Sequence, residues 1–320
     1  MRKILSSVIL TISSFLFVFF FLEILLRSGY FERYSTIWVS PDSLKIRHSI
    51  ENELYKRAKN NEKNGYFFFN DDIPKKQKST KKRIIVLGDS FVFGEGLPYK
   101  QSWPHKLNKL INVEHSVETL AWGVGGWSSK DQFFFFKKHG LQYKPDFLII
   151  GFVDNDPEEL MKFPKCKSKA FQISNFWKRA SKFYTVLFID QHLVRLNYIA
   201  NCEDHIKRLY TKENLELYEK LIIDFKIYLE KNKVPFVFIL TPSNYDKHFK
   251  FVNSKIIPIL EKHKIDFINT YPEVVRKTSH IPYRLLWANP GDRHPGEQMT
   301  EIFAKEAFKF LKKNNFFSTQ

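Results

Sequence analysis

Residues 84–87, Ile-Ile-Val-Leu, form a run in which every side chain is aliphatic. A strand with one face in solvent alternates polar and apolar residues, so this run predicts a strand that is buried on both faces. Strands of that kind belong to parallel sheets whose two faces are covered by helices. The run therefore favours an α/β architecture.

Four more apolar segments follow, and helix-like segments separate them. The other strands are predicted at residues 113–120, 147–153, 236–240 and 266–269, and the helices at 99–111, 129–139, 215–229, 254–260 and 297–311. This alternation predicts a doubly wound, flavodoxin-like parallel sheet of five strands in a three-layer α/β/α arrangement. Reactive residues are expected at the carboxyl ends of the strands.

The 320 residues are enough for one main core with appendages. We predict an anchor over residues 1–27, a polar stalk over 28–82 and the α/β domain over 83–315. Residues 157–214 interrupt the alternation and are interpreted as an insertion with helical pieces.

The amino terminus carries a long apolar stretch. Residues 4–22 contain no charge, and the stretch extends to Leu26 if Glu23 lies at the interface, which matches the roughly 20 residues that cross a bilayer. A cleavable signal peptide has a shorter apolar segment and small residues at its cleavage site. This segment is long, rich in Phe and followed by Glu23 and Arg27, so we predict an uncleaved, single-pass transmembrane anchor.

Basic residues flank the anchor on both sides. Arg2 and Lys3 precede it, and the positive charges that follow are partly offset by Glu23 and Glu32. Because positive charge favours the cytoplasmic side, this balance predicts that the main domain is extracytoplasmic, either periplasmic or extracellular.

The formal net charge is +17, and residues 56–83 hold ten Lys or Arg against three Asp or Glu. This segment is a solvated stalk, a strip attracted to anionic lipid at about 1 kcal/mol per basic residue, or a nucleic-acid site. Nucleic acid ranks last because no recognised binding module is present, and we expect no nucleic-acid partner. Cys166 and Cys202 are the only cysteines, and they form one disulfide only if the domain is exported.

The candidate nucleophile follows the first strand. Gly88 permits a sharp turn, which leaves Ser90 at the carboxyl end of that strand. The alternative is an ordinary turn in which Asp89 or Ser90 caps the next helix. The distinction depends on partners elsewhere in the chain.

Three later segments supply such partners. Residues 121–129, Ala-Trp-Gly-Val-Gly-Gly-Trp-Ser-Ser, bring backbone amides close to a ligand or simply form a turn. The third strand ends at Asp154-Asn155-Asp156, and a predicted loop places Asp292 and His294 just before the last helix.

These residue types fit acyl transfer by a serine. Serine needs a neighbouring base, for which His294 is the candidate, and Asp292 is the candidate that orients the imidazole. The negative oxygen of the tetrahedral intermediate needs hydrogen-bond donors, and losing one costs about 3 kcal/mol of barrier stabilisation. The Gly126 N–H and the Asn155 amide are the candidates.

Residues 88–96, Gly-Asp-Ser-Phe-Val-Phe-Gly-Glu-Gly, resemble the first block of the SGNH (GDSL-type) hydrolases. The glycine-rich turn, the Asp-Asn-Asp segment and Asp-Arg-His-Pro resemble the family's other three blocks, so the resemblance covers about residues 83–313. It implies that Ser90 is the nucleophile and that the oxyanion hole comprises the Ser90 N–H, Gly126 and Asn155.

Two features depart from the family pattern. The second block often begins with Asn, where this chain has Ala121 or Trp122, so the choice among its glycines stays open. Asp292 and His294 stand in an Asp-x-His spacing where many members have Asp-x-x-His, a shorter spacing that also occurs in membrane-anchored and polysaccharide-modifying branches.

The resemblance implies a membrane-anchored ester hydrolase or O-acyltransferase that acts on acyl esters, acetyl above all, of cell-surface glycan or lipid. The alternative is a non-catalytic, membrane-tethered binding or assembly protein of the same fold. We expect no cofactor and no metal ion, because the sequence has neither the phosphate-binding glycine pattern of nucleotide sites nor a His-x-x-x-His ligand set.

Overall fold

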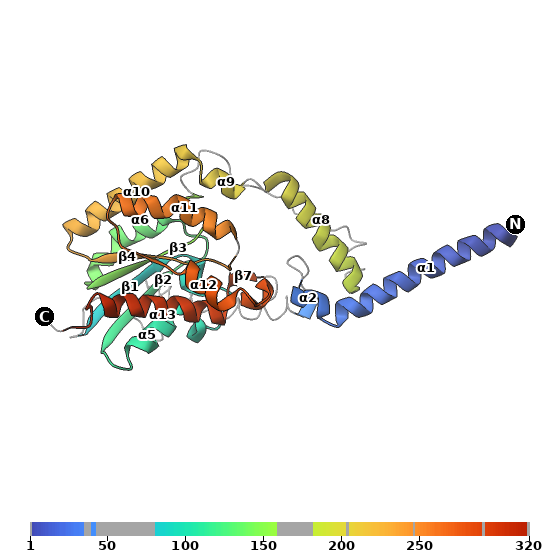
Figure 1. Ribbon diagram of the computed structural model, residues 1–320, viewed down its shortest axis with the longest axis horizontal. Coiled ribbons are helices and arrows are strands. Elements are labelled where there is room, and N and C mark those ends of the chain that lie inside the picture. The colour runs from blue at the N-terminus through green and yellow to red at the C-terminus, as the bar shows by residue number, and fades with distance from the viewer. Residues whose placement is uncertain are drawn as a thin grey trace.

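A computed structural model describes residues 2–34, 40–42, 81–158, 182–202, 205–245, 247–289 and 292–318 (Figure 1). Its centre is a five-stranded sheet in the order β2-β1-β3-β4-β5, with every neighbouring pair parallel. The strands are β1 (Lys82–Gly88), β2 (Val117–Gly123), β3 (Phe147–Phe152), β4 (Phe236–Leu240) and β5 (Phe267–Asn269). The predicted doubly wound parallel sheet is confirmed.

Helices cover both faces of the sheet, as the uninterrupted apolar strands require (Figure 1). Alternate residues of β1 enter two separate cores: Ile85 and Leu87 pack on one face, and Ile84 and Val86 on the other. The first face carries α6 (Ser129–His139), α10 (Lys212–Lys231) and α11 (Lys247–Lys262); the second carries α5 (Trp103–Ile111), α12 (Tyr271–Thr278) and α13 (Glu297–Lys313).

Most predicted elements are present with shifted ends. The helix predicted over residues 129–139 is α6, which begins with a capping box between Ser128 and Asp131. The second strand was predicted to begin four residues too early. Asn112 ends α5, its side-chain amide donates to the Val117 carbonyl at 3.0 Å, and Val113 is exposed, so residues 112–116 form the turn before the strand.

The segment with Asp292 and His294 was predicted as a loop and is instead half of a small hairpin. After η4 (Tyr283–Leu286), strand β6 (Trp287–Asn289) pairs antiparallel with β7 (Asp292–Pro295). Trp287 is buried, and the N–H of Gly296 donates to the Leu286 carbonyl at 2.7 Å. Strand pairing satisfies the backbone groups next to this buried side chain, which a loose loop leaves unpaired.

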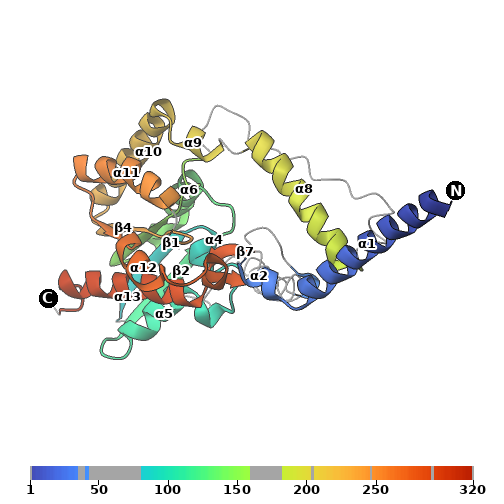
Figure 2. The same ribbon diagram turned by 45° about the vertical axis from the view of Figure 1, so that its right-hand side comes forward.

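Three helices lie outside the α/β sandwich: α1 (Arg2–Arg27), α2 (Tyr30–Tyr34) and α8 (Tyr184–Cys202). The short helix α9 (His205–Leu209) buries Leu209 in the core of the first face. Helix α1 points away from the sheet in Figures 1 and 2. Its segment Ile4–Arg27, 24 residues long, is the one helix of the described part that is long and apolar enough to cross a membrane. Cys166 lies outside the described residues, as does the side chain of Cys202, so their pairing stays a prediction.

Candidate active site

The candidate site lies at the carboxyl ends of three neighbouring strands. β1 pairs with β2 on one side and with β3 on the other. Ser90 follows β1, Gly126 follows β2 and Asn155 follows β3, so the serine comes from the middle strand and the two candidate donors from the strands that flank it. The strand order reverses at β1, and ligands of open parallel sheets bind at such a point.

Ser90 begins the single-turn helix α4 (Ser90–Phe93) and is 7% exposed. The turn is fixed by Asp89, whose carboxylate accepts a hydrogen bond from the N–H of Phe91 at 2.9 Å. Asp89 is therefore the helix cap that the alternative interpretation expected. The cap and a nucleophilic role for Ser90 are compatible, because the cap bond holds the backbone that carries the serine.

His294 reaches Ser90 from the far end of the chain. Its Nε2 lies 2.9 Å from Ser90 Oγ, although 204 residues separate the two. The imidazole also lies edge-on to the Phe91 ring, 5.6 Å between centroids, which holds its plane. When Nε2 is the unprotonated nitrogen, the hydroxyl donates to it, which is the arrangement that a base needs to remove the proton.

Asp292 lies two residues before His294 on β7. Its side chain lies outside the described residues, so its role as the group that orients the imidazole stays a prediction.

Of the three candidate glycines of the second block, Gly123, Gly125 and Gly126, the first and the last differ in surroundings. A Cβ at Gly123 would lie 2.3 Å from the backbone nitrogen of Phe93, so β2 packs directly on α4 only because this residue has no side chain. Gly126 has φ +80° and is exposed, with open space where a Cβ would be. Gly123 is thus explained by packing, whereas Gly126 stands at an exposed turn with open space beside it, so of these two Gly126 is the better oxyanion candidate.

Asp156 joins two of the three loops, a role that sequence reasoning missed. Its buried carboxylate accepts hydrogen bonds from the N–H of Val153 at 2.7 Å, from Gln132 Nε2 at 2.7 Å and from Ser129 Oγ at 3.1 Å. These partners tie the turn that carries Asn155 to the start of α6, just after Gly126. The position of Asp156 within the Asp-Asn-Asp segment was a signal, but only the structure gives its partners.

Two further carboxylates near the site were also missed. Glu95 Oε2 lies 3.7 Å from His294 Nε2, where its charge stabilises an imidazolium. Asp154 Oδ2 lies 2.9 Å from Nε2 of His248, which stands at the start of α11. Glu95 lies in the first block, five residues after the serine, so the sequence could have predicted that it lies near Ser90. The pairing of Asp154 with His248 could not be predicted in this way, because it depends on how β3 and β4 pack.

Burial raises the pKa of two carboxyl groups near the candidate site, those of Asp89 and Asp156. It raises the pKa of Asp89 from 3.8 to about 6, against the opposing effects of the Phe91 N–H and the positive charge of His294. Burial, followed by the charge of Asp89, raises the pKa of Asp156 well above its ordinary value. Both groups therefore favour the protonated form more strongly in the folded protein than in the unfolded chain.

Asp89→Asn is expected to become more stabilising relative to the parent as the pH rises from 4 to 6. In this interval the unfolded parent releases the Asp89 proton while the folded parent retains it, so the parent loses stability that the uncharged Asn does not lose. Asn still caps α4. The change in relative stability is on the order of 3 kcal/mol for a shift of about two pKa units, measured by urea unfolding at pH 4 to 8. A difference that does not vary with pH would contradict it.

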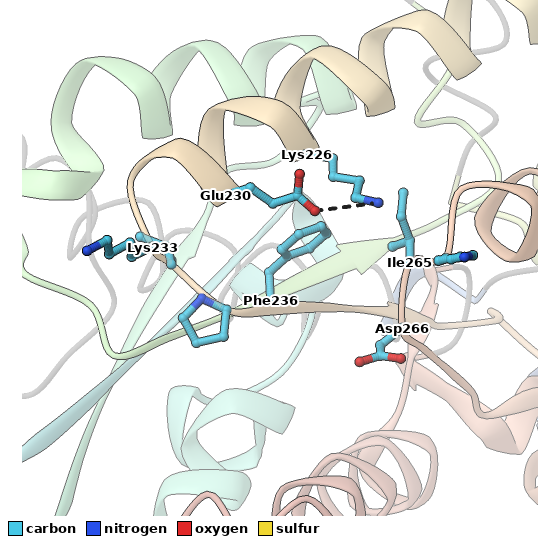
Figure 3. A pocket seen from close by; sticks show the side chains of 9 residues that line it. Lys226, Glu230, Lys233, Phe236, Ile265 and Asp266 are labelled. Atoms are coloured by element: carbon cyan, nitrogen blue, oxygen red, sulfur yellow. Dashed lines mark ion pairs between the residues drawn. The ribbon is translucent and has the colours of Figure 1, made fainter.

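The hollow in Figure 3 does not belong to this site. It is a cavity of about 400 Å³ lined by residues such as Lys226, Glu230 and Phe236, and the Lys226 ammonium lies 3.5 Å from the Glu230 carboxylate. The cavity lies at the amino ends of β4 and β5, whereas Ser90 follows the carboxyl end of β1. The cavity and the candidate site are therefore at opposite ends of the strands. Among the described residues, no group of three or more His, Cys, Asp or Glu side chains is placed to hold a metal ion.

The sheet order, with a Ser–His pair at its carboxyl edge, defines a doubly wound α/β protein with a candidate serine site. No protein-family model and no curated protein matches the chain. Its structural neighbours include a lipolytic protein of the G-D-S-L family and esterases.

Three of these solved structures are a member of the lipolytic G-D-S-L family from Veillonella parvula, a psychrotrophic esterase from Pseudoalteromonas and an acetylxylan esterase from Geobacillus stearothermophilus. They are 15%, 14% and 14% identical to this chain, with TM-scores of 0.45, 0.45 and 0.44. The matches cover 72%, 74% and 77% of this chain and 99%, 100% and 100% of the neighbours.

Proposed function

We propose that this chain is a membrane-anchored serine ester hydrolase or O-acyltransferase that works through an acyl-Ser90 intermediate. The observation that carries the proposal is the 2.9 Å contact between Ser90 Oγ and His294 Nε2. A serine paired with an imidazole at the switch point of a parallel sheet is equipped for nucleophilic attack on a carbonyl.

The reaction follows from the roles of these groups. Ser90 Oγ attacks the ester carbonyl while its proton moves to His294 Nε2, and Asp292 and Glu95 stabilise the imidazolium. The N–H groups of Ser90 and Gly126 and the Asn155 amide bind the oxyanion. The imidazolium then protonates the leaving alcohol, which departs as the carbonyl re-forms.

The second half of the reaction releases the acyl group. His294 removes a proton from water, giving hydrolysis, or from an acceptor hydroxyl, giving transfer, and that oxygen attacks the acyl-Ser90 carbonyl. We propose acyl esters of cell-surface glycan or lipid as substrates, with acetyl the first choice. The extracytoplasmic side proposed for the domain is where such glycans lie.

The contacts of α1 support a retained anchor. Glu23 accepts hydrogen bonds from Tyr184 and Thr185, more than 150 residues later in the chain, and Arg27 donates to the Lys182 carbonyl. Cleavage after the apolar segment removes or separates these partners. A cleaved signal sequence makes no lasting contacts with the mature protein, so these specific hydrogen bonds favour an anchor that stays attached.

A fluorophosphonate probe tests the proposal, because it modifies only a serine that is activated as a nucleophile. The membrane-embedded parent is expected to be labelled, and Ser90→Ala is expected to lose the label. Ser254→Ala, which changes an exposed serine of α11, is the matched control and is expected to keep it. A folded parent that takes no label would favour the non-catalytic binding protein instead.

A further inference from the structure

The first backbone N–H groups of helix α8 donate to the carboxylate of Glu23, which stands near the end of α1. The two oxygens of Glu23 accept hydrogen bonds from the backbone N–H of Tyr184 at 3.0 Å and from the N–H and hydroxyl of Thr185 at 2.9 Å each. The first N–H groups of a helix have no partner within the helix and carry partial positive charge, so a carboxylate there is stabilised. Glu23 thus fixes the start of α8 to α1.

Arg27 completes the junction. It donates to Glu23 from Nε at 2.8 Å and to the Lys182 carbonyl at 3.1 Å, and its guanidinium lies 4.4 Å from the centre of the Tyr184 ring. A carboxylate close to a lipid phase is tolerated when it is paired and hydrogen-bonded. The network therefore explains why an acidic residue stands within an otherwise apolar segment.

The depth of the junction follows from aromatic contacts. Phe183, the residue before α8, packs edge-on against Phe19 with ring centroids 5.7 Å apart. Phe19 stands eight residues before Arg27, about 12 Å along the helix at 1.5 Å per residue, well inside the apolar span. The amino end of α8 is therefore level with the last turns of that span.

The direction of α8 differs from that of α1. In Figures 1 and 2, α8 starts beside the carboxyl-terminal part of α1 and leads away from it at a steep angle, toward the α/β domain. A helix that leaves the end of a membrane-spanning helix at a steep angle runs along the membrane surface. Beyond the junction, Ile189, Leu193 and Leu196 are 43%, 41% and 61% exposed. Their spacing of four and three residues places them on one face of the helix.

We infer that α8 is an interfacial helix whose stripe of Ile189, Leu193 and Leu196 enters the lipid at the membrane surface, with Glu23 as the latch that holds it there. The inference rests on the proposed membrane anchor and extends it. The occupant of the stripe is lipid because the stripe continues from a junction that is level with the apolar span. Apolar faces of such helices enter roughly 5–10 Å of the bilayer boundary. Two attachments then orient the catalytic domain on the membrane, where one would leave it free to turn.

Spin labels in full-length protein reconstituted into phosphatidylcholine vesicles test this. Cys166 and Cys202 are replaced by Ser, and single cysteines are placed by Leu193→Cys and Leu196→Cys, with Ile9→Cys as the lipid control and Val113→Cys as the water control. Both controls stand at exposed positions. Collisions with oxygen report lipid, and collisions with a water-soluble nickel complex report water. The labels on α8 are expected to show several-fold higher ratios of oxygen to nickel collisions than position 113.

The outcomes separate the two proposals. Lipid at position 9 with water at 193 and 196 would overturn the interfacial helix and leave the anchor intact. Water at position 9 would overturn both. Labels at 193 and 196 that neither reagent reaches would mean that protein covers the stripe, which also overturns the inference.

The latch has its own test. Glu23→Ala is expected to lower the oxygen-to-nickel ratio at positions 193 and 196 several-fold while position 9 is unchanged. Thr11→Ala is the control, because the Thr11 side chain bonds to the Ser7 carbonyl of its own helix. Unchanged ratios in Glu23→Ala would show that the carboxylate does not hold α8 at the surface.

Discussion

Replacing His294 with alanine is expected to lower kcat/KM for an activated acetyl ester by about 10³- to 10⁴-fold, the upper part of the range for a lost general base. Ser90 Oγ then has no imidazole at 2.9 Å to take its proton. The loss is expected in kcat, because His294 takes the proton in the transition state and does not contribute to ground-state binding of the ester. Initial rates with p-nitrophenyl acetate measure it.

Two readouts distinguish the loss of a base from damage to the fold. The parent's rate is expected to rise with pH as the imidazole loses its proton, and the His294→Ala rate is expected to lose that step. Added imidazole is expected to restore part of the activity of the variant. His115→Ala is the control, since His115 lies at the amino end of β2, and the candidate site lies at the carboxyl ends of the strands. A His294→Ala enzyme within about tenfold of the parent would contradict the general-base role.

The second large effect is expected at Asn155. Asn155→Ala is expected to lower kcat by about 10²- to 10³-fold with little change in KM, because an oxyanion donor acts mainly when the negative charge develops. Asn155→Asp is expected to lose more, since a carboxylate places negative charge where the oxyanion forms. The same ester assay measures both variants.

The effect must be separated from a disturbed turn. The turn that carries Asn155 is held by Asp156 and by the bond from the Glu158 N–H to the Asn155 carbonyl at 2.9 Å, and neither depends on the Asn155 side chain. Unfolding curves of Asn155→Ala are therefore expected to match the parent. Asn232→Ala serves as the control, because Asn232 is exposed and precedes the amino end of β4, away from the candidate site. A loss smaller than about tenfold would exclude Asn155 from the oxyanion hole.

The position of the site relative to the membrane bears on substrate choice. His294 stands on β7, and η4, which leads into this hairpin, contacts α2: Arg284 donates to the Glu32 carbonyl at 3.1 Å. The amino-terminal helices thus contact the segment that carries the candidate base. With α1 as the proposed membrane anchor, this contact is expected to hold the candidate site near the bilayer surface, where both lipid and surface glycan are within reach.

The sequence alone determined the features that depend on local patterns. The apolar run of β1 predicted a strand buried on both faces, because every side chain in it avoids water whichever way it points. The helix predicted over residues 129–139 has the bounds of α6, and four short blocks predicted which residues stand at strand ends. Each of these follows from residues close together in the chain.

Only the tertiary structure decided which distant residues meet. The contact of Ser90 with His294, the hairpin that carries His294, the bonds of Asp156 and the latch between Glu23 and Thr185 all depend on packing between elements far apart in sequence. The hairpin was missed because the pairing of β6 with β7 depends on the packing that buries Trp287, which the local sequence does not show. Local propensity encodes a strand or a cap, but the partner of a buried polar group is set by the geometry of the whole core.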